Sequence, residues 1–218
     1  EQVQESKSDH ADIIPSKSKG SFAIIAALDL TEVKGAGQQK LSENIGLLYT
    51  QPITNRLSMS TGALYSRKNY ESPYSFYKPE NPYKGSHAPT HVSAVCDVLS
   101  VPILVNHKIF QAKSYTITAS TGLSSYIMLK ERYDFTYTGE GYKSYNTSYT
   151  LNGKNQHYFG VADFSVSFDR KINNKFSIGI RPFMQIPLTG IGYGRTNLQS
   201  RGVAVSFGID LSKLDSFL

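Results

Sequence analysis

Few residues in this chain have the type and spacing that chemistry requires. The segment Gly190-Ile-Gly-Tyr-Gly194 is superficially similar to a phosphate-binding glycine loop. Such a loop must follow a strand and open a helix within a βαβ unit, and no helical pattern surrounds this one. We therefore interpret the segment as a tight connection in which glycine supplies a positive φ angle. We expect no cofactor.

The histidines offer no clear metal site. His10, His87, His91, His107 and His157 show no metal-ligand spacing. His87 and His91 could approach each other at the end of one loop, but a pair of this kind is usually solvated. We predict no metal centre.

Acyl-transfer chemistry would need a serine or histidine with carboxylate support. Ser124 and Ser125 near His157 form one weak arrangement of that kind. We predict no catalytic residues, and a lipid-modifying membrane enzyme remains an alternative.

The elements that would position these residues are strands, because from residue 21 onward the dominant hydrophobic period is two. Within 175–186, for example, Phe176, Ile178 and Ile180 alternate with Ser177, Gly179 and Arg181. The same alternation, least regular in 92–105, marks the segments 22–30, 44–50, 57–66, 92–105, 115–123, 158–168, 175–186 and 202–211. The pattern predicts eight strands of roughly 10–14 residues, long enough to cross a bilayer at a tilt.

The two faces of these strands differ in a way that favours a membrane barrel. One face is aliphatic, and the other consists mainly of small uncharged residues, with scarcely any Lys or Glu. Aliphatic residues facing lipid around a narrow, filled lumen would give this pattern. A soluble sandwich or lipocalin-like barrel would invert the two faces, and its exposed strands would normally carry Lys and Glu. We predict an all-β, eight-stranded antiparallel up-and-down transmembrane barrel, with the soluble barrel as the alternative.

A few charged residues interrupt the small-residue faces. We predict that Asp29, Asp97, Asp163, Arg181 and Asp210 form a charge network inside the barrel. Unpaired buried charges are costly, so ion pairs are expected. Asp163 and Arg181 lie on neighbouring strands and are predicted to meet across the hairpin.

The connections alternate in length. Short links at 51–56, 107–113 and 171–175 alternate with long ones at 33–41, 67–91, 131–156 and 188–198. Outer-membrane barrels have short periplasmic turns and long extracellular loops. We therefore expect both termini in the periplasm, with a flexible leader or linker at 1–20, the barrel at 21–212 and a tail at 213–218.

Tyrosine and phenylalanine are concentrated in two of the long loops. Such rings either form the aromatic belt and rigidify loops, or make a recognition surface, because Tyr offers a large contact area at low entropic cost. We predict a loop recognition surface made of Tyr70, Tyr74, Phe76, Tyr77, Tyr83, Tyr133, Tyr137, Tyr142 and Tyr145.

Composition excludes several other classes. The longest apolar run, 22–28, is far shorter than the roughly 20 residues of a membrane helix. The single Cys96 excludes a disulfide scaffold. The net charge of +6 is scattered along the chain, so we expect no nucleic-acid partner.

Three segments resemble an outer-membrane β-barrel domain family abundant in Bacteroidota. Cys96-Asp-Val-Leu-Ser-Val-Pro-Ile-Leu-Val105 is similar to that family's "L-[DE]-[IV]-P-[IL]" strand, and Thr121-Gly-Leu-Ser-Ser-Tyr-Ile-Met-Leu-Lys-Glu-Arg-Tyr133 to its "GLSSYxMxKExY" segment. Phe183-Met-Gln-Ile-Pro-Leu-Thr-Gly-Ile-Gly-Tyr-Gly194 resembles its "PYxKIPLKGIGxG" ending. The resemblance implies architecture more than activity. It also implies that some members are C-terminal barrels of longer envelope-spanning chains.

The sequence therefore predicts a non-enzymatic barrel in the bacterial outer membrane, surrounded by outer-membrane lipid. Its loops would be presented for protein–protein or envelope interaction. The chain would act alone, as a subunit of an outer-membrane complex, or as the barrel of a longer signalling protein.

Overall fold

The computed structural model describes residues 20–79, 87–139 and 142–211. The expected leader, except for Gly20, and the expected tail lie outside these residues. Nine strands and a single turn of 3₁₀ helix occupy the described part: β1 Ser21–Val33, β2 Gln39–Pro52, β3 Leu57–Pro73, η1 Tyr74–Phe76, β4 His91–Gln111, β5 Tyr115–Gly139, β6 Tyr142–Asn152, β7 Gln156–Lys171, β8 Phe176–Pro187 and β9 Leu198–Asp210. Among these residues, no helix has the length and apolarity needed to cross a membrane.

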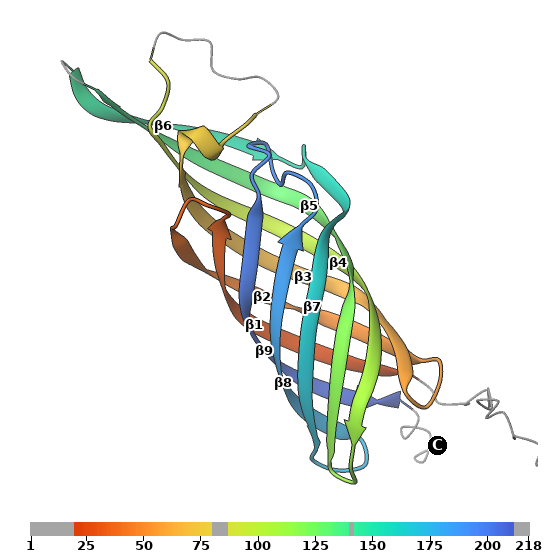
Figure 1. Ribbon diagram of the computed structural model, residues 1–218. Helices are drawn as coiled ribbons and strands as arrows, with labels where there is room; N and C mark the ends of the chain where they lie inside the picture. The colour runs from red at the N-terminus through yellow and green to blue at the C-terminus, as the bar shows by residue number, and fades with distance from the viewer. Residues whose placement is uncertain (1–19, 80–86, 140–141, 212–218) are drawn as a thin grey trace, which may run out of the picture.

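The strands close into an antiparallel barrel (Figure 1). The sheet order is β4-β3-β2-β1-β9-β8-β7-β5-β6, and the pairing of β4 with β5 completes the ring. β6 and β7 pair with the same edge of β5, one above the other, and therefore form one wall segment. The wall thus has eight strands, which confirms the predicted fold class.

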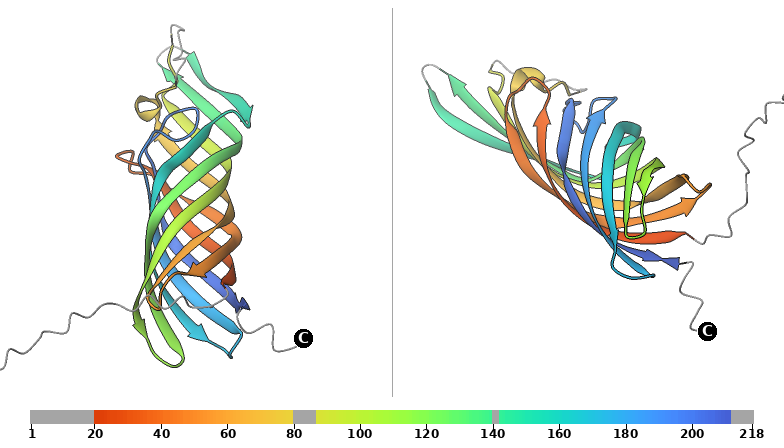
Figure 2. Two further views of the ribbon diagram at one scale, coloured as in Figure 1. Left: turned by 90° about the vertical axis from the view of Figure 1, so that its right-hand side faces the viewer. Right: turned by 60° about the horizontal axis from the view of Figure 1, so that its bottom comes forward.

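One predicted loop is largely strand. Residues 131–156 were expected to connect two strands, but β5 continues to Gly139 and β6 returns antiparallel to it. Tyr and Thr, which favour strands, dominate this stretch. The resulting β5–β6 hairpin projects beyond the barrel wall (Figures 1 and 2).

The connections separate the barrel into two ends, named here the short-turn end and the long-loop end. Links 53–56, 112–114 and 172–175 lie at the short-turn end, whereas 34–38, 188–197 and the described parts of 74–90 (74–79 and 87–90) lie with the β5–β6 hairpin at the long-loop end. The predicted alternation is confirmed, although 34–38 is shorter than expected. The amide of Leu211 donates to the carbonyl of Gly20 across 3.0 Å, so both ends of the described barrel lie at the short-turn end.

The outward face of the barrel is aliphatic. Leu28, Ile45 and Ile180 are each more than half exposed. Their strand neighbours Asp29 and Asn44 are buried in the interior. This is the arrangement predicted for a membrane barrel and the opposite of that expected for a soluble one.

The interior is polar at mid-height and apolar at the long-loop end. A large cluster that includes Tyr70, Tyr133, Met128 and Ile191 fills the long-loop end. A smaller one joins Ile25, Leu48 and Ala204. The apolar interior at the long-loop end was not expected from the small-residue pattern. In β4 at that level the inward residues Val92, Ala94, Cys96 and Val98 are apolar, and the outward face carries Ser93 and Asp97, so the polar and apolar faces are reversed relative to the small inward faces of the other strands.

Candidate functional site

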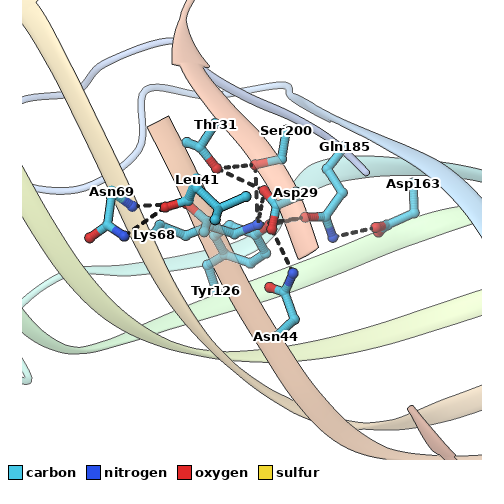
Figure 3. Close-up of polar contacts among 11 residues, drawn as sticks. Asp29, Thr31, Leu41, Asn44, Lys68, Asn69, Tyr126, Asp163, Gln185 and Ser200 are labelled. Carbon is cyan, nitrogen blue, oxygen red and sulfur yellow. Dashed lines mark hydrogen bonds and ion pairs between the residues drawn. The ribbon is translucent and has the colours of Figure 1, made fainter. Parts of the chain in front are cut away.

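A buried ammonium group lies at the centre of the polar interior (Figure 3). The Nζ atom of Lys68 donates to Asp29 Oδ2 at 3.0 Å and to Ser200 Oγ at 3.1 Å. It also lies 3.3 Å from Gln185 Oε1. Both charged side chains are almost completely shielded from solvent. The positive charge is therefore compensated within the barrel by side chains from β1, β8 and β9.

Asp29 receives further hydrogen bonds on both oxygens. Asn44 Nδ2 donates to Oδ1 at 2.6 Å, and the Thr31 hydroxyl donates to Oδ2 at 2.8 Å. A carboxylate that accepts several hydrogen bonds in addition to an ion pair recovers much of the cost of burial.

The network continues through Gln185 to a second carboxylate. Gln185 Nε2 donates to Asp163 Oδ1 at 2.8 Å, and the Tyr126 hydroxyl donates to Gln185 Oε1 at 2.9 Å. Ser124 Oγ donates to Asp163 Oδ2 at 2.6 Å. We call the connected residues Asp29, Thr31, Asn44, Lys68, Ser124, Tyr126, Asp163, Gln185 and Ser200 the central network. It connects seven strands across the lumen.

The sequence prediction placed the charged residues only partly correctly. Asp29 and Asp163 belong to the central network. Asp97 does not, because it lies on the outward face of β4, where Arg67 Nε donates to it at 2.9 Å and the Tyr65 hydroxyl at 2.8 Å. The inward residues of β4 next to Asp97 are apolar, so the sequence pattern did not reveal that Asp97 points outward.

The predicted Asp163–Arg181 pair is also wrong. Asp163 is opposite Gln185 in the β7–β8 register, four residues along β8 from Arg181. Both side chains face the interior, but Arg181 lies nearer the short-turn end. Asp210 faces the interior too, at the mouth of the short-turn end, away from the central network.

The central cation was missed because the predicted third strand ended at residue 66. Extending the alternation by two residues places Lys68 on the small, inward face. The same extension places Tyr70 inside. The missing signal was thus the length of β3, which reaches Pro73.

The predicted tyrosine surface divides into a buried and an exposed part. Tyr70, Tyr77 and Tyr133 are at most 5% exposed and pack inside the long-loop end, so they are not a recognition surface. Tyr74 and Phe76 are half-buried against the same cluster. Tyr83 and the side chain of Tyr142 lie outside the described part of the chain.

Tyr77 is the centre of the buried part. Its ring lies 5.5 Å from that of Tyr133, 5.4 Å from Phe135 and 6.4 Å from Tyr193. Edge-to-face contacts of this kind add to the burial of apolar area. Burial raises the pKa of the Tyr77 phenol well above its ordinary value, so the ring remains neutral.

The glycine-containing link 188–197 closes the same end. Ile191 is buried, and the amide of Tyr193 donates to Glu131 Oε2 at 2.8 Å. Gly192 has a φ of 69°, as expected for a tight connection. The buried carboxylate of Glu131 also accepts from the Tyr133 hydroxyl and from Asn155 Nδ2, each at 2.5 Å. Sequence reasoning did not identify Glu131.

Among the predicted residues whose side chains the structure describes, Tyr145 on the β5–β6 hairpin is the exposed one, at 46%, and its ring stacks at 4.6 Å on Tyr137, which is only 6% exposed. Tyr149, which was not among the predicted residues, is 43% exposed and contacts Tyr193 at 5.7 Å. A pocket of about 170 Å³ lies beside these rings. Its lining consists of Tyr74, Tyr77, Pro79, Pro89, Phe135, Tyr137, Tyr149 and Tyr193.

The serine–histidine arrangement considered for acyl transfer is not assembled. Ser124 faces the lumen and donates to Asp163, whereas Ser125 accepts from the amide of Phe159. Nε2 of His157 accepts from the amide of Gly192. Within the described ranges, no three His, Cys, Asp or Glu side chains converge as a metal site would require.

No family model and no curated protein matches the chain. Among solved structures, Neisserial surface protein A aligns with a TM-score of 0.51 at 10% identity, over 88% of this chain and 97% of that protein. Ail, the attachment invasion locus protein of Yersinia pestis, aligns with a TM-score of 0.44 at 11% identity, over 88% and 98%. The outer membrane protein OprG of Pseudomonas aeruginosa gives 0.42 at 11% identity, over 88% and 96%. The likeness to Neisserial surface protein A shows that the chain has the fold of an eight-stranded outer-membrane barrel.

Proposed function

We propose that this chain is a non-enzymatic barrel that is anchored in the bacterial outer membrane and binds a partner protein with its β5–β6 hairpin. The aliphatic outward face and the shared fold support the membrane location. The central network and the apolar clusters fill the lumen, which does not suit an open channel. The extracellular position of the long-loop end is part of the proposal.

The open edge of β6 is the observation that carries the binding proposal. Among the described strands β6 pairs only with β5, and it is the last strand in the sheet order. Its residues 143–150 are all exposed, and Lys143 is the only charged residue among them. A long exposed edge with little charge is a template for another strand.

The partner that fits this edge is an extended protein segment. Such a segment can add to the sheet through main-chain hydrogen bonds. Tyr145 and Tyr149 then provide ring contacts, and the neighbouring aromatic pocket can accept a side chain of the partner. This deepens the predicted loop recognition surface, with the buried Tyr70, Tyr77 and Tyr133 as its support.

A photo-crosslinking amino acid at Tyr149 tests the proposal in intact cells. The matched control replaces Tyr115, which is 53% exposed at the short-turn end. We expect a discrete protein adduct at position 149 that is lost when Tyr145 is changed to Ser, and no such adduct at position 115. Equal adducts at both positions, or none at 149, would contradict the proposal.

A membrane-impermeant maleimide tests which end faces outward. Thr147→Cys on β6 should be labelled in intact cells, and Asn174→Cys in the 172–175 turn should be labelled only after lysis. Cys96 is buried and serves as the internal background. The opposite labelling pattern would place the long-loop end in the periplasm.

Membership of the Bacteroidota family stays a prediction that rests on the three motif segments. Two wider contexts also stay predictions: a subunit of an outer-membrane complex, and the barrel of a longer envelope-spanning signalling protein. Sequencing the complete reading frame in its source would test the longer signalling protein, and co-purification from native membranes in mild detergent would test the complex.

A further inference from the structure

A second interior site lies at the short-turn end, remote from the proposed hairpin surface. A cavity of about 240 Å³ opens there, lined by the ends of β1, β2, β3, β4, β5, β7, β8 and β9 and by the 172–175 turn. Its charged lining residues are Lys108, Asp169, Lys171, Lys175, Arg181 and Asp210. Four cations therefore face two carboxylates, so the cavity has a positive balance.

Arg181 is the innermost of these cations. It also lines a smaller cavity of about 80 Å³ on the side of the central network, so its side chain lies between the two spaces. Its Nε atom is fully shielded and donates to no acceptor among the described residues. No ion pair within 4.0 Å joins it to a described carboxylate.

The nearest candidate partner is already engaged. Asp169 lines the same cavity, and its Oδ2 accepts from Ser167 Oγ at 2.6 Å. Its Oδ1 lies over Gly179, where an added Cβ would be only 2.1 Å away. Asp169 is therefore packed against the wall at Gly179 and attracts the guanidinium only through space, without a hydrogen bond or an ion pair within 4.0 Å.

We infer that the short-turn cavity binds an oxyanion, a phosphate or a carboxylate group, with Arg181 as its principal ligand. A buried guanidinium that lacks a direct ion pair is costly, and a bound anion reduces that cost. The planar guanidinium matches the two oxygens of a carboxylate or phosphate. Lys171 and Lys175 at the mouth would attract the anion and complete its charge balance.

The binding test uses the full chain refolded in detergent micelles. Isothermal titration compares sodium phosphate, sodium acetate and sodium chloride at one ionic strength. Saturable binding of phosphate, acetate or both supports the inference, and which of them binds identifies the oxyanion class. Heat signals no larger than those of chloride would overturn it.

Arg181→Gln should reduce oxyanion affinity at least about tenfold, since it removes a charged hydrogen-bond donor. Lys113→Gln is the matched control, because Lys113 lies in the 112–114 turn, carries the same charge and does not line the cavity. Unchanged affinity in Arg181→Gln, or an equal loss in Lys113→Gln, would overturn the assignment.

Lys171→Gln keeps the test decisive if the Arg181 variant does not fold. Lys171 is exposed, so its substitution should leave the barrel intact. We expect a weaker but measurable loss of oxyanion affinity, about two- to fivefold, since exposed pairs contribute less than buried ones. Affinity equal to that of the Lys113→Gln control would contradict the site.

Discussion

Lys68 Nζ lies 3.0 Å from Asp29 Oδ2, and neither side chain is more than 1% exposed. The pair links β1 to β3 through the lumen, between strands that share no ladder. The central network extends it to β2, β5, β7, β8 and β9. A buried ion pair of this kind adds little net stability relative to an apolar pair, but the loss of one partner leaves an uncompensated buried charge.

Lys68→Met should destabilise the barrel by about 3–5 kcal/mol, since it leaves Asp29 buried without a cation. The double variant Asp29→Asn with Lys68→Met should recover a large part of this loss. Arg67→Gln, which removes the half-exposed outward pair with Asp97, should cost only about 0–1 kcal/mol. Urea unfolding in micelles, followed by circular dichroism because the chain has no Trp, measures all three. Equal losses in the Lys68 and Arg67 variants would contradict the central role of the pair.

The alternation of aliphatic and small residues was sufficient to predict the barrel, its strand number and its outward face. A hydrophobic period of two is a property of each strand by itself, so strands such as 22–30 could be predicted directly from the sequence. The partners of buried charges depend on register, which the alternation does not reveal. Arg181 was therefore paired with Asp163, although the residue opposite Asp163 in the register is Gln185.

Interior positions at the long-loop end were harder to predict for a different reason. Tyrosine is compatible with an exposed loop, an aromatic belt and a packed interior, so the presence of a tyrosine in the sequence does not show whether it is buried. Tyr133 and Tyr145 both fall in the predicted loop 131–156, yet one is buried and the other is 46% exposed. The difference arises because β5 lines the barrel at Tyr133, whereas β6 projects beyond it.

Gly62→Ala should destabilise the barrel by at least about 2 kcal/mol, because an added Cβ would lie 2.0 Å from the backbone oxygen of Leu47. Relief would require β2 and β3 to separate. Gly208→Ala is the control, since its nearest neighbour is the rotatable Ser177 hydroxyl at 2.5 Å. Thermal unfolding in micelles should show a large shift for the first variant and little for the second. Similar shifts in both would disprove the close approach of the two strands at Gly62.

Tyr77→Ala should loosen the 74–90 link, because the ring is packed between Tyr133, Phe135 and Tyr193. Tyr77→Phe should behave like the parent chain, since the hydroxyl is buried and makes no hydrogen bond to the described residues. Hydrogen–deuterium exchange of the Lys78 amide, which donates to the carbonyl of Gly194 at 2.7 Å, measures the difference. We expect exchange at least about tenfold faster in the Ala variant, which corresponds to the loss of a buried ring's packing. Equal protection in the Ala and Phe variants would show that the ring does not hold the link.

Leu47→Lys should impair insertion into phospholipid vesicles, because Leu47 is 54% exposed on the aliphatic outward face of β2. A lysine at the level of the hydrocarbon core costs about 2–4 kcal/mol, and one near the interface only about 0–1 kcal/mol. Ile53→Lys provides the second case, since Ile53 is similarly exposed but lies in the 53–56 turn. The folded fraction in vesicles, read from heat-dependent gel mobility, should fall for Leu47→Lys and hold for Ile53→Lys. If both variants inserted as well as the parent chain, the aliphatic band would not be a lipid-facing surface. The proposed membrane anchoring would then lose its physical basis.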